Sequence, residues 1–311
     1  VELTETVLSL KNDRFKLYAM AKTATTIFPG DPAEIITGHI LNFCGLSEEP
    51  APFEGVSYQH DRILGLDSTA LENFMKKVVK GVEKKLDADE TRLLRNKIDA
   101  FLSSGNVVLK ARGLRIAGLV DYCDVLPLVL RSTAVKNEKP FVRRDAFIAL
   151  SMLAQCKSEM RSEIFTAILA GLDDPYYESR FSAAKCVAVF SELYGLNNDE
   201  KDDLLAKLYK NLCDRCFEVR IEAILAVSKI ENDKEKVLKN FSGRYFDKVW
   251  KVRESIYKGL EILTERKVID PKTALVEMEK ILITSNGYLT EYELKKQYNK
   301  SRSEILREVE K

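Results

Sequence analysis

Apolar residues recur at helical spacing along much of the chain. In residues 217–230 the apolar side chains Ala223, Ile224 and Val227 fall on one face of a helix. Four further segments repeat this pattern, at 109–120, 141–153, 177–190 and 250–263. No stretch shows the alternation of apolar and polar residues, with hairpin turns, that is typical of strands. The pattern therefore predicts an all-α protein.

Each of these five segments carries an arginine near its start and a short polar residue six positions earlier. The arginines are Arg112, Arg143, Arg180, Arg220 and Arg253. The polar residues are Asn106, Asn137, Asp174, Asp214 and Asp247. Short polar residues close turns and cap helices, so each of these positions predicts a tight turn before a helix. Successive arginines are 31, 37, 40 and 33 residues apart, which indicates an internal repeat.

A second amphipathic segment precedes several of the turns, so each repeat is predicted to be a helix, a turn and a helix. These preceding segments are 123–135, 161–172 and 202–212. One helix pair cannot bury both of its apolar faces, whereas stacked pairs share a continuous core. We expect each arginine to donate hydrogen bonds to carboxylates and amides in its own turn and in adjacent turns.

The Asp or Asn in the turn, the arginine six residues later and the repeat length together resemble the HEAT-repeat family of armadillo-like α-solenoids. The resemblance covers residues 94–265. It implies a superhelical α-solenoid of stacked antiparallel helical pairs that acts as a scaffold, an adaptor or a regulatory surface for another macromolecule. The motif specifies a fold and carries no catalytic residue by itself.

The two ends of the chain fit the repeat less well. Residues 1–93 are expected to form a divergent helical N-terminal cap, or a separate domain, with helices at 13–28, 31–46 and 67–86 and a loop rich in proline and glycine near 45–62. Residues 266–311 are expected to form a C-terminal helical cap or tail. The alternative is a helix-turn-helix with a turn at Asn299, in which Arg302 and Arg307 would face nucleic acid.

Composition narrows the class of protein. Forty-nine Lys and Arg against 48 Asp and Glu give a formal net charge of +1, which argues against a general nucleic-acid or anionic-membrane binder. No apolar run is long enough to span a membrane, and the first residues lack the basic start and apolar block of a signal peptide, so we expect a soluble chain. Because it begins at Val1 without a methionine, it is also consistent with a segment of a longer chain.

The six cysteines favour the cytoplasm or another reducing compartment, because Cys156, Cys186 and Cys213 fall within apolar helical patterns. Cys213 and Cys216 form one C-x-x-C, but a zinc site needs four ligands and His39 and His60 are the only histidines. We therefore expect this pair to be core or turn thiols.

No sequence motif for hydrolysis, phosphate binding or dinucleotide binding occurs, so no catalytic residue, cofactor or metal is predicted. The chain is expected to be non-enzymatic, with the regulatory part of a larger enzyme as an alternative. A nucleic-acid-binding HEAT-like protein, similar to a DNA-repair glycosylase or using the C-terminal helix-turn-helix, is the other alternative. The near-neutral charge weighs against it.

The remaining prediction is a surface that binds a protein partner, with no membrane contact. Four aromatic residues stand in or next to the turns: Phe141, Tyr177, Phe217 and Trp250. Three lysines are expected on helix faces that look away from the core: Lys185, Lys229 and Lys258. Exposed aromatics are favoured anchors in interfaces. The alternatives are that each aromatic packs over the start of its own helix and that the lysines are only solvated.

Overall fold

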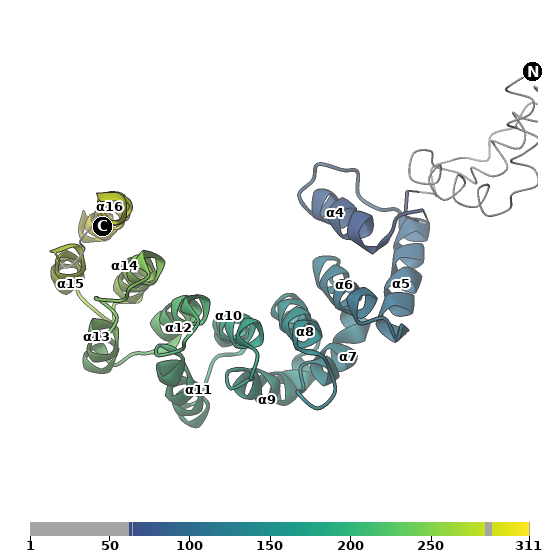
Figure 1. The fold of residues 1–311 in the computed structure, drawn as a ribbon, viewed down its shortest axis with the longest axis horizontal. Helices are drawn as coiled ribbons and strands as arrows, with labels where there is room; N and C mark the ends of the chain where they lie inside the picture. The colour runs from purple at the N-terminus through teal and green to yellow at the C-terminus, as the bar shows by residue number, and fades with distance from the viewer. Residues whose placement is uncertain (1–61, 64, 284–287, 311) are drawn as a thin grey trace, which may run out of the picture. The chain divides into compact units, whose positions relative to one another are not determined.

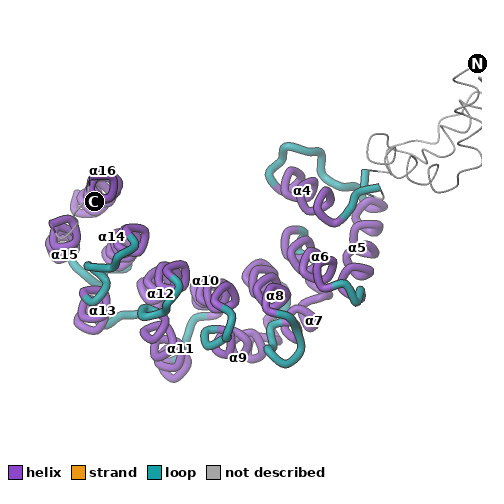
Figure 2. Tube along the Cα trace, in the orientation of Figure 1, coloured by secondary structure: helices purple, strands orange, loops and turns teal. Residues whose placement is uncertain are grey.

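The computed structural model describes residues 62–63, 65–283 and 288–310. All regular elements in these residues are helices (Figure 2), which confirms the all-α prediction for this part of the chain. The chain divides into two compact units, residues 1–97 and 98–311. No helix among the described residues is long and apolar enough to cross a membrane.

In the first unit, α4 (Ser68–Val79) begins at Asp67, whose carboxylate accepts hydrogen bonds from the backbone N–H groups of Thr69 and Ala70, both at 2.8 Å. The sequence predicted that this helix continues to residue 86, and this was wrong. Gly81 has a φ of 71°, which ends the helix. The N–H of Gly81 and that of Val82 turn back to carbonyls of the last helical turn, at 3.0 and 2.9 Å.

The start of α5 (Ala88–Ser103) is tied to the residues before α4. Arg62 donates two hydrogen bonds of 2.8 Å to the buried carboxylate of Glu90. Lys97 donates to the carbonyl oxygen of Ile63 at 2.9 Å. The helices predicted at 13–28 and 31–46 lie outside the described residues, as do His39, His60 and nearly all of the predicted loop near 45–62.

The second unit contains eleven α-helices within the described residues, joined in places by short 3-10 turns. They are α6 (Val107–Leu119), α7 (Leu126–Ser132), α8 (Pro140–Leu153), α9 (Arg161–Gly171), α10 (Tyr177–Tyr194), α11 (Asn198–Asn211), α12 (Phe217–Ile230), α13 (Lys234–Ser242), α14 (Trp250–Glu265), α15 (Pro271–Ile283) and α16 (Tyr288–Glu310). The five segments aligned by sequence are α6, α8, α10, α12 and α14.

These helices pack mostly with the helix two places along the chain. In Figure 1, α6, α8, α10, α12 and α14 follow one another side by side, and each packs against the next. Helices α7, α9 and α11 lie along one side of this row, and each also packs on the helix that follows it in sequence. Each of these helices is therefore held mainly by its near neighbours in sequence.

The core lies between the row of helices and the helices along its side. It depends on small residues where helices approach closely. Ala146 on α8, Ala183 on α10 and Ala223 on α12 are completely buried. Gly171, near the end of α9, faces the ring of Phe147, and a Cβ atom there would overlap with that ring. The largest buried side chains of this unit include Phe147 and Tyr257. Alanine and glycine thus set how closely the layers pack.

The C-terminal segment corrects the sequence prediction. Residues 288–310 form one continuous helix, α16, so the turn predicted at Asn299 does not form and a helix-turn-helix is absent there. Leu294, Ser301 and Ile305 are buried along one side of this helix. The ring of Tyr298 contacts that of Tyr257 on α14, with 6.3 Å between centroids. A continuous buried stripe therefore crosses the position of the predicted turn.

The cysteines also differ from the prediction of reduced thiols. Cys123 and Cys156 form a disulfide, which does not fit a reducing compartment. Cys186 is a free, fully buried thiol, and burial raises its pKa to about 12. Cys213 lies in the turn after α11 and is exposed, so the prediction that it falls inside a helical pattern was wrong.

Candidate functional site

The turn between α9 and α10 is joined to α8 by a buried ion pair. Arg143, near the start of α8, donates through Nε and Nη2 to the two carboxylate oxygens of Asp174, at 2.7 and 2.6 Å. The side chains of Arg143 and Asp174 are 3% and 1% exposed. A paired guanidinium and carboxylate can be buried together because each satisfies the charge and the hydrogen bonds of the other.

The same contact occurs at the next two turns. Arg180 on α10 donates to Asp214 at 2.7 and 3.0 Å. Arg220 on α12 donates to Asp247 with two bonds of 2.8 Å. In each case the arginine of one turn reaches the aspartate of the following turn. We call these three pairs, Arg143–Asp174, Arg180–Asp214 and Arg220–Asp247, the arginine ladder.

Each aspartate of the ladder also organises its own turn. Its carboxylate accepts the N–H two residues later, at 2.8 Å from Tyr176, 2.9 Å from Cys216 and 3.0 Å from Val249. Its carbonyl oxygen accepts a bond from the arginine six residues later, at 2.7 Å from Arg180, 2.8 Å from Arg220 and 2.9 Å from Arg253. The six-residue offset thus places an arginine against its own turn and the turn that follows.

The outer copies of the repeat are arranged differently. Asn106 caps α6 by accepting from Val108 N at 2.9 Å, and Asn137 donates to the carbonyl oxygen of Arg131 at 2.9 Å. Arg112 is half-buried on α6. Arg253 is 8% exposed, and its Nε has no hydrogen-bond partner among the described residues. The ladder as defined therefore ends at Asp247.

The four turn aromatics singled out from the sequence, Phe141, Tyr177, Phe217 and Trp250, are all half-buried at the first residues of their helices. The hydroxyl of Tyr177 donates to the Glu178 carboxylate at 3.2 Å. The most exposed aromatic of these turns is Phe246, which precedes Asp247 and is 71% exposed. Sequence reasoning missed Phe246 because it does not occupy one of the positions that recur in the five repeated segments.

The three predicted surface lysines each contact a carboxylate. Lys185 lies 3.7 Å from Glu222 and above the ring of Phe181. Lys229 pairs with Glu192 at 2.5 Å, from α12 to α10. Lys258 lies 3.3 Å from Glu254, one turn earlier on α14. Their charges are therefore compensated within the chain.

Three other cations, at the turns before α12 and α14, have no carboxylate within ion-pair distance among the described residues. They are Arg215, Lys248 and Lys251, and all are exposed. The two turns lie side by side, because Arg244 reaches the sulfur of Cys213 at 3.5 Å and Arg220 binds Asp247. The Nζ of Lys251 lies 5.9 Å from the centre of the Trp250 ring. We call Arg215, Phe246, Lys248, Trp250 and Lys251 the basic turn edge.

A second charged cluster, which the sequence analysis missed, links α6, α8 and α10. The carboxylate of Asp145 is completely buried and lies 3.4 Å from Arg115 and 2.8 Å from Arg144. Arg144 also donates to Glu178 at 2.7 Å. The only signal in the sequence is an aspartate directly after two arginines, which occurs by chance too often to indicate a buried cluster.

The Glu178 carboxylate in this cluster is held ionised by its neighbours. Burial raises the pKa of Glu178, but hydrogen bonds from Tyr176 and Arg144 outweigh it, so the pKa lies below its usual value. Burial and the hydrogen bond to Glu178 raise the pKa of Tyr176 to about 12. Glu178 therefore pairs with Arg144 near neutral pH, and this ion pair links α8 to α10.

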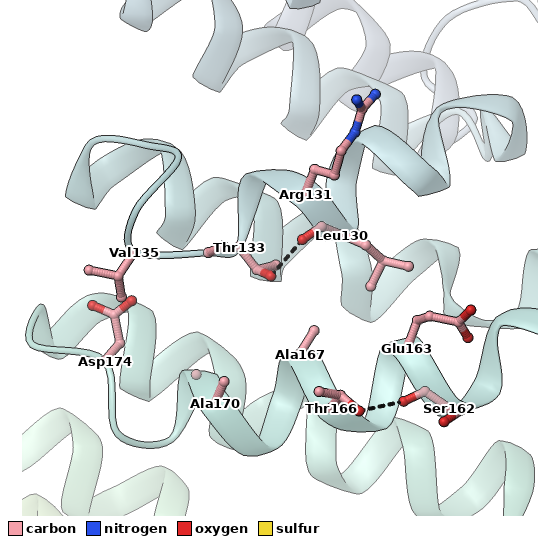
Figure 3. A pocket seen from close by; sticks show the side chains of 12 residues that line it. Leu130, Arg131, Thr133, Val135, Ser162, Glu163, Thr166, Ala167, Ala170 and Asp174 are labelled. Carbon is pink, nitrogen blue, oxygen red and sulfur yellow. Dashed lines mark hydrogen bonds between the residues drawn. The ribbon is translucent and has the colours of Figure 1, made fainter.

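A groove separates α7 from α9 and has a volume of about 560 Å³ (Figure 3). Small residues of α9 form its floor, with Ala167 and Ala170 pointing into the space. Val135 and Asp174 close one end, and the Arg131 side chain points away from the groove. This volume lies within the range of sites that bind ligands or side chains of a partner. No family model matches the chain, and the search of curated proteins found no match.

Proposed function

We propose that the chain is a non-enzymatic HEAT-like α-solenoid scaffold that binds an acidic segment of a protein partner. The basic turn edge would be the binding surface. The observation that carries the proposal is the combination of an aromatic side chain, Phe246, 71% exposed, with three neighbouring cations that no described carboxylate neutralises. Aromatic and cationic side chains together are favoured anchors for a partner.

The arginine ladder explains why this edge is positively charged. The carboxylates of Asp214 and Asp247 lie next to the exposed cations, but the guanidiniums of Arg180 and Arg220 already occupy both of their oxygens. The charges of Arg215 and Lys248 therefore remain available to a ligand. A partner that carries Asp or Glu around an apolar residue would match both the charges and the Phe246 ring.

The sequential packing of the helices supports the same function. Helices that pack mainly with near neighbours leave a long row of turns at the surface, and the ladder keeps these turns at fixed spacing. A rigid edge of this kind binds an extended segment without ordering itself first. Nucleic acid is the less suitable partner, because the unpaired cations of the edge are few and the net charge of the chain is +1.

The test measures binding of a fluorescein-labelled peptide, in which glutamates flank one leucine, by fluorescence anisotropy at low and high salt. We expect salt-dependent binding that falls by at least about tenfold in the Lys248→Glu/Lys251→Glu variant, since two attractive charges become repulsive. The matched control is Lys295→Glu/Lys296→Glu, which makes the same charge change at exposed positions of α16.

Three outcomes would contradict the proposal. The first is absence of peptide binding even at low salt. The second is an equal loss of binding in the α16 control variant, which would show that only the total charge matters. The third is tighter binding of a short DNA duplex than of the peptide, with a steep salt dependence, which would favour a nucleic-acid partner instead.

A further inference from the structure

The Cys123–Cys156 disulfide joins two connections that lead into the walls of the α7–α9 groove. Cys123 lies in the connection from α6 to α7, and Cys156 lies in the connection from α8 to α9. Their Cα atoms are 5.4 Å apart. Since α7 begins at Leu126 and α9 at Arg161, the covalent bond fixes the N-terminal ends of the two helices relative to each other.

Non-covalent contacts hold the corresponding connections farther along the unit. Arg161 donates to both oxygens of Glu200, at 2.6 and 2.7 Å, and so joins the start of α9 to that of α11. Arg266 donates to the carbonyl oxygens of Ser228 and Glu231 at 2.6 and 2.8 Å. The disulfide occupies the position in this helix pair that these polar contacts occupy in the helix pairs farther along the unit.

Helix α7 has few other attachments to α9. No hydrogen bond or ion pair joins the two helices directly within the described residues, whereas α9 and α11 are also joined through Asp173, which binds Lys207 and Lys210. At the far end of the groove, Asp174 is bound by Arg143 of α8 and not by α7. Helix α7 has seven residues and packs mainly on α8, with Leu126 and Val129 buried.

We propose that the Cys123–Cys156 disulfide is a redox-controlled clamp that sets the width of the α7–α9 groove. In the oxidised chain the groove keeps the volume of about 560 Å³. Reduction frees the start of α7 from α9 and lets α7 move on its remaining contacts with α8. The clamp acts on a different surface from the basic turn edge and does not depend on binding there.

The chemistry requires a dithiol reductant. Its thiolate attacks one sulfur of the disulfide, which breaks the S–S bond and forms a mixed disulfide. The second thiol of the reductant then displaces the cysteine and closes the oxidised, cyclic form of the reductant. Two electrons and two protons pass from the reductant to Cys123 and Cys156. Both residues are half-buried, so a small dithiol can reach them.

The test compares amide hydrogen exchange by mass spectrometry in the oxidised chain, in the chain reduced with dithiothreitol, and in the Cys123→Ser/Cys156→Ser variant. We expect exchange in residues 123–135 to become at least about tenfold faster on reduction. The double variant should show the same fast exchange before and after addition of dithiothreitol. Exchange in α12 and α14 should not change, which serves as the internal control for folding.

Two results would overturn the clamp. The first is a tryptic map of the unreduced chain, purified under air, that lacks the linked peptides of Cys123 and Cys156. The second is exchange in residues 123–135 that is equal in the oxidised, reduced and double-variant chains. A Cys186→Ser variant, which removes a buried thiol outside the clamp, should keep its response to dithiothreitol.

Discussion

Arg143 and Asp174 form two hydrogen bonds of 2.7 and 2.6 Å across the contact between α8 and the α9–α10 turn, with both side chains buried. We expect Asp174→Asn to lower the free energy of unfolding of this unit by about 3 kcal/mol, because it leaves a buried guanidinium without a counter-charge. Urea unfolding followed by circular dichroism measures the change.

The control for this prediction is Lys258→Gln. Lys258 is 47% exposed and lies 3.3 Å from Glu254, so loss of this surface pair should change the free energy of unfolding by less than about 0.5 kcal/mol. Equal effects of the two substitutions would show that burial of the ladder contributes nothing to stability.

Gly171 lies where α9 meets α8 and α10. A Cβ atom there would overlap with the Phe147 ring and approach the Cβ of Ala183 to 2.8 Å. Gly171→Ala should therefore destabilise the unit by about 2 kcal/mol through overpacking. Gly105→Ala is the matched control, because a Cβ atom at Gly105 meets nothing within 4 Å. Thermal unfolding of the two variants distinguishes the steric effect from a general effect of losing glycine.

Glu261 on α14 is expected to make stability depend on pH. Burial and the nearby carboxylates Glu265 and Glu304 raise its pKa. A raised folded-state pKa means that folding favours the protonated form, so stability is lost as the pH rises through that pKa. Glu261→Gln should raise Tm at pH 7 by about 2 °C and leave Tm unchanged at pH 4, where the wild-type carboxyl is largely protonated. An equal shift at both pH values would contradict this explanation.

Asp173 is expected to have the opposite pH dependence. Hydrogen bonds from Lys207 and Lys210 lower its pKa. Its contribution to stability is therefore complete above the pKa of the unfolded state, about 3.9, and is lost as the pH falls through the lower folded-state pKa. Asp173→Asn should reduce stability at pH 7, and its difference from the wild type should shrink as the pH falls below the pKa of the unfolded state. Acid titration followed by circular dichroism tests this, and a constant difference at every pH would contradict it.

The sequence was sufficient for α6, α8, α10, α12 and α14 and for the turns that precede them. Both follow from local chemistry: a short polar residue that bonds the N–H two positions later, and an apolar face that repeats at helical spacing. The offset between Asp214 and Arg220 also selected residues that contact one another in the structure. Whether the array is a HEAT-like solenoid stays a prediction.

The features that the sequence could not supply depend on contacts between distant residues. The partner of Cys123 is 33 residues away, and spacing alone does not determine which cysteines pair. Asn299 suggested a turn, but the buried side chains of Leu294, Ser301 and Ile305 favour a continuous helix. The cations of the basic turn edge do not recur at a regular spacing in the sequence. Within the part of the chain that the structure describes, they remain unpaired because the ladder arginines already bind the nearby aspartates, and this depends on contacts between distant residues.

The ladder also makes the helix pairs exchangeable. The segment from Pro175 to Asp214 contains both Arg180 and its partner, Asp214. Excision of this segment would join Asp174 to Arg215 and leave Arg143–Asp174 and Arg220–Asp247 each with both members. Because each such segment carries one arginine and one aspartate of the ladder, a chain shortened or lengthened by one segment would keep every ladder arginine matched with an aspartate.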